Sequence, residues 1–223
     1  MKTKILFKEF CTHDVMHFVL EKPAGFTFVP GHATTLSFTS GKLKGQKHEF
    51  TFTSLPSDLV LEFTIKIYPE HKDFTLALSE AKVGTELDVE APFGTIEYKH
   101  KGTFIAGGAG ITPFIAILRD LRSKGKLAGN RLIFSNKTQA DVILEKEFRS
   151  MFESSPSDLI FTLTREQKPG YESGRIDMDF LKKHIKDFKG RQFYICGPPM
   201  FLFQIRKDLK KLGAKIDEIV FER

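Results

Sequence analysis

The segment Gly107-Gly-Ala-Gly-Ile-Thr-Pro113 has the residue types of a phosphate-binding loop, and it directly follows the apolar stretch Thr103–Ala106. Glycines let a backbone turn tightly and approach a phosphate, whose charge is met by unpaired N–H groups and by the helix dipole. Thr112 is a favourable N-cap and Pro113 a favourable first helical residue, so a helix is expected to begin here. Gly-x-Gly without a third glycine is a weak dinucleotide fingerprint, and an ordinary glycine-rich turn is the alternative.

Polar and small residues also end three other stretches with strand character. These ends are Ser135-Asn136, Thr164-Arg165 and Cys196-Gly197. In a doubly wound sheet the ligand lies at the carboxyl ends of the strands, which meet at one edge. A purely structural sheet would not need a polar rim of this kind. We therefore expect these residues to form one ligand site together with Gly108 and Gly110.

Strands and helices must alternate through the second part of the chain for that edge to form. Strands are expected at 103–106, 131–134, 159–164, 192–196 and 216–221, and helices at 113–124, 142–152, 178–186 and 199–212. Alternation with short connections is typical of an α/β nucleotide-binding domain whose parallel sheet is covered on both faces.

The first part of the chain has a different pattern, with short runs of aromatic and β-branched residues separated by turn residues. Strands are expected at 5–7, 15–20, 35–38, 49–52, 59–68 and 86–90, with one short helix at 75–80. Strands at this spacing predict a closed or nearly closed antiparallel β-barrel.

The formal charge divides the chain at the same place. The whole chain carries +6, but residues 1–98 hold 10 Lys, no Arg and 13 acidic residues, which gives −3. Residues 99–223 hold 24 basic and 15 acidic residues, which gives +9. We therefore expect two domains with different ligands, residues 1–98 and residues 99–223, although a basic solvated surface also explains the second value.

The composition is that of a globular protein. Apolar residues make up 41% of the 223 residues and charged residues 28%, which argues against a disordered, collagen-like or coiled-coil chain. No apolar run approaches the roughly 18 residues of a membrane span, and the N-terminus lacks the apolar stretch of a signal peptide. Cys11 and Cys196 are too few for a four-thiolate metal site and suit a reducing compartment. A cytoplasmic protein without a metal is expected.

Four motifs, taken in order, resemble those of the ferredoxin–NADP reductase superfamily. The stretches Phe104-Ile-Ala-Gly-Gly-Ala-Gly-Ile-Thr-Pro-Phe114 and Tyr194-Ile-Cys-Gly-Pro-Pro-Met200 look like its two nicotinamide-domain signatures. Phe28-Val-Pro-Gly-His32 and Ala91-Pro-Phe-Gly94 resemble its barrel motifs. The resemblance covers nearly the whole chain. It implies a Greek-key flavin-binding barrel followed by an NAD(P)-binding α/β domain.

The resemblance implies FAD, with FMN less expected, held first by the stretch His48-Glu49-Phe50-Thr51. Family members carry Arg-x-Tyr-Ser/Thr here: the Arg pairs with the flavin pyrophosphate, the aromatic ring packs on the isoalloxazine, and the hydroxyl approaches N5. Phe50 and Thr51 suit those roles, but the imidazole of His48 is not equivalent to a bidentate, permanently charged Arg. Lys47 or Lys66 is the expected substitute for the charge. Further flavin contacts are expected from Lys66, Ile67, Phe74 and Thr75.

The nicotinamide side is implied in the same way. Cys196 would lie beside the nicotinamide as a positioning residue, while Gly197 and Pro198 let the ring approach, and hydride would pass directly from nicotinamide C4 to flavin N5. Glu222 matches a C-terminal acid that many plant-type relatives place near both rings. Thr51, Cys196 and Glu222 are therefore the expected catalytic residues. Other nucleotide contacts are expected from Gly108, Gly110, Thr112, Pro113 and Met200.

The choice between NADPH and NADH depends on cations beside the adenosine ribose. The stretch from Thr164 to Tyr171 resembles the Ser-Arg segment that holds the 2′-phosphate in NADP-dependent members. Arg165 and Lys168 would supply charge and Tyr171 a stacking surface, with Asn136 adding a polar contact. NADPH is therefore preferred over NADH, although NADH-dependent relatives also carry an Arg near here and both cations can be plain surface residues.

We expect an FAD-dependent NAD(P)H reductase that passes single electrons to a separate flavodoxin or ferredoxin, acidic proteins that a +9 domain would attract. The basic runs Lys182-Lys183, Arg206-Lys207 and Lys210-Lys211 are candidate docking positions, with plain solvation as the alternative. An oxygenase reductase component using NADH, or a reductase of free flavin or quinone, is the second possibility. A non-enzymatic nucleotide-binding protein with impaired flavin binding is the third. Nucleic-acid binding has little support, because no stretch interleaves aromatic and basic residues.

Overall fold

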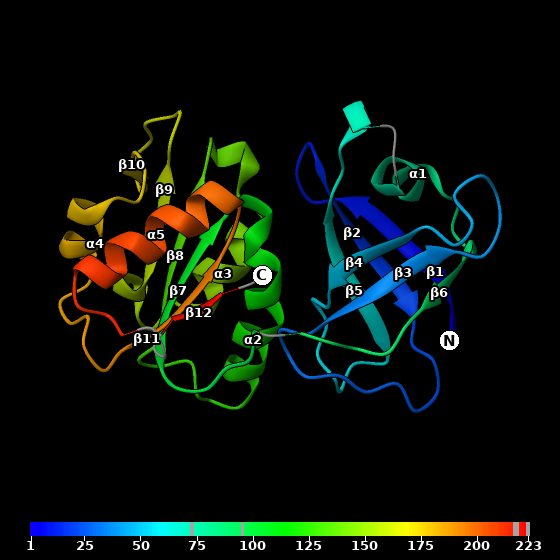
Figure 1. The fold of residues 1–223 in the computed structure, drawn as a ribbon, viewed down its shortest axis with the longest axis horizontal. Coiled ribbons are helices and arrows are strands. Elements are labelled where there is room, and N and C mark those ends of the chain that lie inside the picture. The colour runs from blue at the N-terminus through cyan, green and yellow to red at the C-terminus, as the bar shows by residue number, and fades with distance from the viewer. Residues whose placement is uncertain (72–73, 95, 216–218, 222–223) are drawn as a thin grey trace. The chain divides into compact units, whose positions relative to one another are not determined.

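The computed structural model describes residues 1–71, 74–94, 96–215 and 219–221. The chain forms two compact units (Figure 1). The first contains Met1–Glu97 together with Thr112–Asp120, and the second contains Tyr98–Ile111 together with Leu121–Arg223. Among the described helices, none combines the length and the apolar character needed to cross a membrane.

Six antiparallel strands build the first unit, in the order β4-β3-β6-β1-β2-β5. Their bounds are Lys2–Phe10 (β1), Val15–Glu21 (β2), Ala33–Phe38 (β3), Lys47–Thr51 (β4), Val60–Lys66 (β5) and Glu86–Val89 (β6). Just beyond β4, Phe52 bridges Phe63 of β5, and the N–H of Thr53 donates to the carbonyl oxygen of Glu62 at 2.8 Å. The two edge strands therefore meet and close the sheet. Because β6 returns beside β3, the order β6-β3-β4-β5 is a Greek key, and the expected barrel is confirmed.

Apolar side chains that point inward fill the barrel. In β2, Phe18 and Leu20 are buried while Val19 between them is partly exposed, as the two-residue period of a strand requires. A 3-10 turn (η1, Pro69–His71) and a short helix (α1, Phe74–Glu80) separate β5 from β6. Phe74 and Leu78 of α1 belong to the same apolar core as the strands. The helix is thus held to the barrel by its buried side.

Six parallel strands form the sheet of the second unit, in the order β10-β9-β8-β7-β11-β12. Their bounds are Gly102–Gly107 (β7), Arg131–Asn136 (β8), Leu159–Leu163 (β9), Glu172–Ser173 (β10), Gln192–Cys196 (β11) and Ile219–Phe221 (β12). The helices are α2 (Thr112–Ser123), α3 (Glu145–Met151), α4 (Met178–His184) and α5 (Pro199–Lys211), with 3-10 turns at Gly108–Ile111 (η2), Gln139–Asp141 (η3) and Pro156–Asp158 (η4).

Helices cover both faces of this sheet. Phe180 of α4 and Leu209 of α5 pack in one apolar cluster with Ile133 of β8, and Figure 1 shows α5 crossing in front of the strands. The next residue of β8, Phe134, points to the opposite face, where its ring meets Phe148 of α3 edge-on with centroids 6.2 Å apart. The expected parallel α/β architecture is confirmed.

Most element bounds differ from the expectation by a few residues, and two helix starts and one strand are notable. The helix expected from Val142 begins at Glu145, because Leu144 has a left-handed φ of 53° that interrupts helical geometry after the η3 turn. Helix α2 begins one residue earlier than expected, at Thr112. Strand β10 was not expected, since two residues carry no periodic pattern. Of the strand expected at 216–221, residues 216–218 lie outside the described part.

Candidate functional site

Residues from the ends of four strands come together at the carboxyl edge of the parallel sheet. Strands β9, β8, β7 and β11 are consecutive neighbours. The register pairs Asn136 with Leu163 and Ala106 with Cys196, so these strands end at the same level. The glycine loop after β7, Asn136, Thr164 and Cys196 therefore lie along one edge, as the sequence predicted.

The glycine loop fits closely against the turn that follows β11. A side chain at Gly110 would place its Cβ 2.4 Å from the carbonyl oxygen of Cys196 and 2.5 Å from the backbone nitrogen of Gly197. Two backbones pack on each other here, so only glycine fits at position 110. The loop leads directly into α2. A backbone-lined surface at the start of a helix is suited to an anionic phosphate.

Asn136 carries a buried amide group that the protein itself does not satisfy. The residue is only 5% exposed, and neither its Oδ1 nor its Nδ2 has a hydrogen-bond partner among the described residues. Its backbone carbonyl, by contrast, accepts hydrogen bonds from the N–H of Thr164 at 2.9 Å and from the Thr164 hydroxyl at 3.3 Å. A buried amide without a partner is costly to the folded protein, and its place on the sheet edge suits a polar ligand.

The stretch after β9 carries the two cations expected to meet a 2′-phosphate, and both are exposed. The ammonium group of Lys168 donates a hydrogen bond to Oε1 of Gln139. Glu166 accepts a hydrogen bond from the backbone N–H of Gln139 at 2.7 Å. Arg165 is thus presented to solvent beside Thr164, whereas Lys168 is tied to the side chain of Gln139.

Sequence reasoning missed a polar cluster around Tyr171. The Tyr171 hydroxyl donates to Glu145 of α3, and Nε of Arg149 pairs with the same carboxylate at 2.7 Å. The Arg149 guanidinium also lies 4.9 Å from the centroid of the Phe161 ring. Burial raises the pKa of Glu145, but hydrogen bonds from Tyr171, Arg149 and Gln139 outweigh it and hold the pKa below its ordinary value. The only signal in the sequence was the i, i+4 spacing of Glu145 and Arg149.

On the barrel, three expected flavin-binding residues come together. The ring of His48 stacks on that of Phe74 with centroids 4.6 Å apart and planes 20° apart, and the ring of Phe50 lies 5.9 Å from Phe74. His48 and Phe50 are partly buried, while Glu49 between them is exposed. Thr51, which ends the strand, is 9% exposed. The expected stretch therefore presents an imidazole and an aromatic ring on one side of β4.

The lysines expected to replace the missing Arg are paired with carboxylates. Nζ of Lys66 lies 2.7 Å from Asp14, and Nζ of Lys47 lies 2.5 Å from Glu90. Hydrogen bonding and charge from Lys66 lower the pKa of Asp14 even though burial acts in the opposite direction as the largest single effect. Neither lysine is held ready for a phosphate in this structure.

An arginine does reach the barrel, but it comes from α2. Nη1 of Arg119 donates to the carbonyl oxygen of Thr53 at 2.7 Å and to Oε2 of Glu62 at 2.9 Å. Nε2 of His17 lies 3.6 Å from the same carboxylate oxygen. The neighbouring imidazole of His17, together with the charge of Arg119, lowers the pKa of Glu62 in spite of burial. This arginine could not be predicted to reach the barrel, because it lies far from the barrel strands along the sequence. In the structure it is paired with Glu62.

Two further residues expected near the flavin are buried in the barrel. Ile67 is 4% exposed and packs in the core. The hydroxyl of Thr75, on the first turn of α1, accepts a hydrogen bond from the backbone N–H of Tyr68 at 3.2 Å. Thr75 therefore holds the segment that follows β5 to α1.

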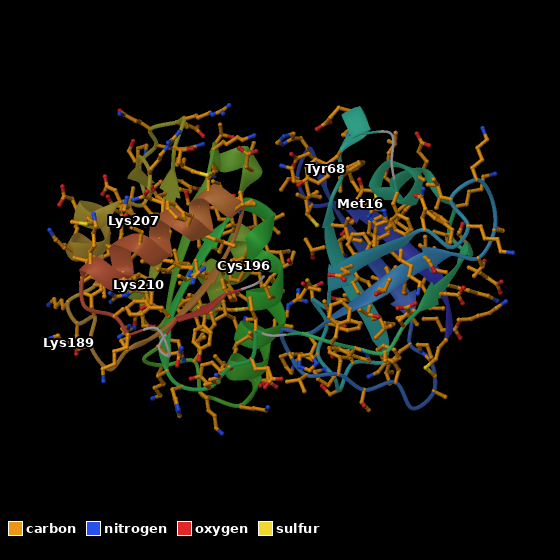
Figure 2. The ribbon with its side chains drawn as sticks, in the orientation of Figure 1. Met16, Tyr68, Lys189, Cys196, Lys207 and Lys210 are labelled. Carbon is orange, nitrogen blue, oxygen red and sulfur yellow. The ribbon has the colours of Figure 1, made fainter. Side chains whose placement is uncertain are left out.

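The remaining expected residues follow the strand ends of the second unit. Thr112 and Pro113 open α2, and Cys196, which Figure 2 labels, is 2% exposed at the end of β11. Pro198 is exposed and Met200 is 76% exposed at the start of α5. Glu222 lies outside the described residues.

Two family models match this chain. The model described as an oxidoreductase FAD-binding domain matches residues 2–98, and the model described as an oxidoreductase NAD-binding domain matches residues 104–207. The chain belongs to the ferredoxin–NADP reductase superfamily. As a member of this superfamily it is an oxidoreductase with an FAD-binding and an NAD-binding domain.

Similar proteins from this superfamily cover most of the chain. NADH-cytochrome b5 reductase 2 of Gallus gallus is 28% identical over an alignment of 248 positions, gaps included, that covers 92% of this chain and 80% of that protein. The ferredoxin–NAD(P)(+) reductase component of the naphthalene 1,2-dioxygenase system of Pseudomonas putida is 25% identical over an alignment of 225 positions, gaps included, that covers 98% of this chain and 67% of that protein.

Solved structures share the fold at lower identity. The FAD/NAD-binding domain of the nitric oxide dioxygenase from Vibrio cholerae superposes with a TM-score of 0.87 at 20% identity, covering 99% of this chain and 97% of that chain. The ferredoxin NADP+ reductase from Neisseria gonorrhoeae superposes with a TM-score of 0.84 at 18% identity, covering 100% and 97%.

The residues present suit both cofactors of the superfamily. The orphaned Asn136 amide and the backbone-lined loop at Gly110 are features that a nucleotide would use. On the barrel, the donor set of β4 offers an aromatic ring, a hydroxyl and an imidazole, which suit a flavin ring and its N5 edge. Fewer residues suit the flavin pyrophosphate, because the cations Arg119 and Lys66 are paired with carboxylates.

Proposed function

We propose that this protein is an FAD-dependent NAD(P)H reductase that delivers electrons one at a time to a separate ferredoxin or flavodoxin. A bound flavin supplies the conversion between a two-electron hydride donor and a one-electron acceptor. The observation that carries the proposal is the unpartnered amide of Asn136 on the sheet edge, in a chain that also matches a flavin-binding model. A buried polar group of this kind is expected where a ligand completes the hydrogen bonding.

We assign the flavin side to β4. Phe50 would pack on a face of the ring, and the hydroxyl of Thr51 would donate a hydrogen bond at the N5 edge. His48, oriented by its stacking on Phe74, would meet the pyrophosphate. An imidazole offers fewer donors than a guanidinium, so FAD should bind more weakly than it would to an Arg at this position.

We assign the nicotinamide side to the ends of β7 and β11. Backbone N–H groups of the loop Gly108–Thr112 would hold the phosphates. Cys196 would orient the nicotinamide through packing, because a lone buried thiol behaves as a small apolar group. Gly197, which lacks a side chain, leaves room for the ring. These residues bind and orient their ligand and take no part in covalent chemistry.

We propose NADPH as the preferred donor. Thr164 and Arg165 are exposed at the end of β9, and a guanidinium there can form a bidentate pair with the 2′-phosphate. Lys168 contributes less, since its ammonium group is bonded to Gln139. The name of the Gallus gallus relative specifies NADH, so a direct comparison of the two donors is the appropriate test.

We propose that the acceptor is an acidic carrier protein. One side of α5 exposes Lys207, Lys210 and Lys211, of which Figure 2 labels Lys207 and Lys210. The acid of the same helix, Asp208, is buried at 3% exposure, so the charged side chains on this side are all basic. A basic surface steers acidic carriers and raises their association rate. The name of the Pseudomonas putida relative, which includes ferredoxin, supports the same class of acceptor.

A visible spectrum of the purified protein tests the core of this proposal. We expect a flavin band that is present after purification or restored by FAD and bleached by NADPH. Absence of the band after FAD addition would overturn the flavoenzyme assignment and favour a non-enzymatic nucleotide-binding protein.

Turnover with different acceptors then tests the partner. Ferredoxin and flavodoxin are compared with cytochrome b5, free FMN and a quinone at low and high salt. We expect the highest kcat/KM with ferredoxin or flavodoxin at low salt. Faster turnover with free flavin or quinone than with any carrier protein contradicts this, and it favours a small-molecule reductase.

A further inference from the structure

One aromatic ring, that of Phe201, lies against both strand-end turns of the candidate nucleotide site. A Cβ built on Gly107 would lie 3.3 Å from three atoms of this ring, and a Cβ built on Gly197 would lie 2.7 Å from its Cδ1. The same Gly197 Cβ would be 3.3 Å from the Cα of Gly107. The two glycine backbones are therefore close to each other, and the Phe201 ring touches both.

The fold fixes the position of this ring. Phe201 lies in the first turn of α5, where the N–H of Leu202 donates to the carbonyl oxygen of Pro198 at 3.0 Å. Phe201 is partly buried and packs on the apolar cluster that contains Ile205 and Leu209 from the same helix. Because the buried side of α5 is anchored to the sheet, the ring cannot move away from the turns without displacing the helix.

We propose that Phe201 is a positioning residue for the nicotinamide nucleotide. Its ring packs against the backbones of Gly107 and Gly197 together, and this packing fixes the conformation of the two turns at the carboxyl ends of β7 and β11. This inference rests on the proposed function, since it concerns the same nucleotide. Removal of the ring leaves the backbones of both turns without this packing, so the turns lose their fixed conformation and binding weakens although no group that contacts phosphate is lost.

The same helix supplies a matched control. Phe203 lies two residues further along α5 and is 60% exposed. It is the same residue type as Phe201 and lies only two residues from it in the helix. A change in helix propensity affects both positions, whereas packing against the two turns is lost at Phe201 alone, and thermal unfolding reports the loss of core packing that accompanies it.

Equilibrium binding of NADP+ and NAD+ to the flavin-loaded protein, measured by titration calorimetry beside thermal unfolding, tests the inference. We expect Phe201→Ala to raise the Kd by about tenfold or more, Phe201→Leu to give an intermediate value, and Phe203→Ala to stay within about twofold of wild type. If Phe201→Ala does not fold, Phe201→Leu carries the test. A lowered Tm with an unchanged Kd would show that the ring only packs the helix and would overturn the proposal.

A double-mutant cycle examines the ring contact itself. Gly107→Ala pushes its new methyl group toward the Phe201 ring, and Phe201→Leu relieves that contact, so the two changes should be non-additive in the Kd. Additive effects contradict the proposal. Wild-type protein that binds neither NADP+ nor NAD+ overturns the proposed function and this inference together, whereas wild-type binding with unaltered variants overturns this inference alone.

Discussion

Nη1 of Arg119 lies 2.9 Å from Oε2 of Glu62, across 57 positions of sequence. Arg119 belongs to α2, and the segment Thr112–Asp120 of that helix is part of the same compact unit as the barrel. The guanidinium also donates to the carbonyl oxygen of Thr53. This residue follows β4 and is next to the Phe52–Phe63 bridge that closes the barrel. One side chain from the second half of the sequence thus ties together the closing strands of the first.

Glu62→Gln should destabilise the protein by about 1 to 2 kcal/mol at pH 7, because Arg119 loses its charged partner. The folded-state pKa of Glu62 lies below its ordinary value of 4.5. The difference in the free energy of unfolding between wild type and Glu62→Gln is therefore complete above about pH 4.5. It is lost as the pH falls through the lowered folded-state pKa. Urea unfolding of wild type and Glu62→Gln between pH 7 and pH 3 measures this difference. Glu21→Gln, at an exposed position, is the control, and a difference that does not shrink in acid would contradict the assignment.

Asn136→Leu should move two properties in opposite directions. Removal of a buried amide without a partner should raise the free energy of unfolding of the ligand-free protein by about 1 kcal/mol, while the Kd for NADP+ should rise. Chemical unfolding and calorimetry on the same preparations measure both.

Asn130→Leu is the matched control for that experiment. The Asn130 amide is buried but satisfied, since Oδ1 accepts from the N–H of Gly102 at 3.0 Å and Nδ2 donates to the carbonyl oxygen of Leu127 at 3.1 Å. Asn130→Leu should lower stability. If both variants lose stability equally, Asn136 is an ordinary structural residue.

Arg165→Ala should lower kcat/KM for NADPH about tenfold or more and leave kcat/KM for NADH nearly unchanged, because only NADPH carries the 2′-phosphate. Steady-state kinetics with ferricyanide as a small acceptor give both values. Arg175→Ala, at another exposed arginine, controls for the loss of one charge. An unchanged ratio of the two donors would remove Arg165 from the phosphate site.

His48→Arg should tighten FAD binding about tenfold, since a guanidinium adds a permanent charge and bidentate donors toward the pyrophosphate. Fluorescence titration of the deflavinated protein with FAD and with FMN measures the effect. The gain should be present for both flavins but larger for FAD, which carries a pyrophosphate. His13→Arg, at an exposed position, should change neither Kd. Weaker binding in His48→Arg would show that the stacked imidazole serves another purpose.

Lys207→Glu together with Lys210→Glu should lower kcat/KM for ferredoxin about tenfold at low salt and flatten its salt dependence. Reduction of ferricyanide should not change. Lys42→Glu with Lys44→Glu makes the same charge change on a hairpin of the barrel and serves as the control. If both double variants lose activity equally, net charge matters and the α5 surface does not.

The fold was largely readable from the sequence because its signals are local. Alternation in β2, turn residues between barrel strands and glycine after β7 each act over a few positions. The sheet edge was also readable, since parallel strands end at one side and their last residues, such as Asn136 and Cys196, are therefore neighbours. The left-handed Leu144 was not readable, because a residue of this type rarely adopts positive φ and its neighbours carry no turn signal.

Side-chain pairing within the site could not be predicted. Tyr171 was expected to offer a stacking surface, and the hydrogen bond from its hydroxyl to Glu145, 26 positions away, was not predicted. Lys66 was expected to supply charge to a phosphate, but Asp14 holds it at 2.7 Å. Each of these contacts depends on which elements the fold places side by side. Residue types and spacing do not predict which elements those are.

The division of α2 between the two units has a consequence for how such chains can be recombined. A junction at residue 98 leaves the barrel without Thr112–Asp120 and without Arg119. A junction after residue 120 keeps that segment but removes β7, the strand between β8 and β11, from the sheet. No single crossover transfers either unit whole. The two halves therefore cannot be exchanged as contiguous segments. A chimera that exchanges the barrel must also exchange Thr112–Asp120.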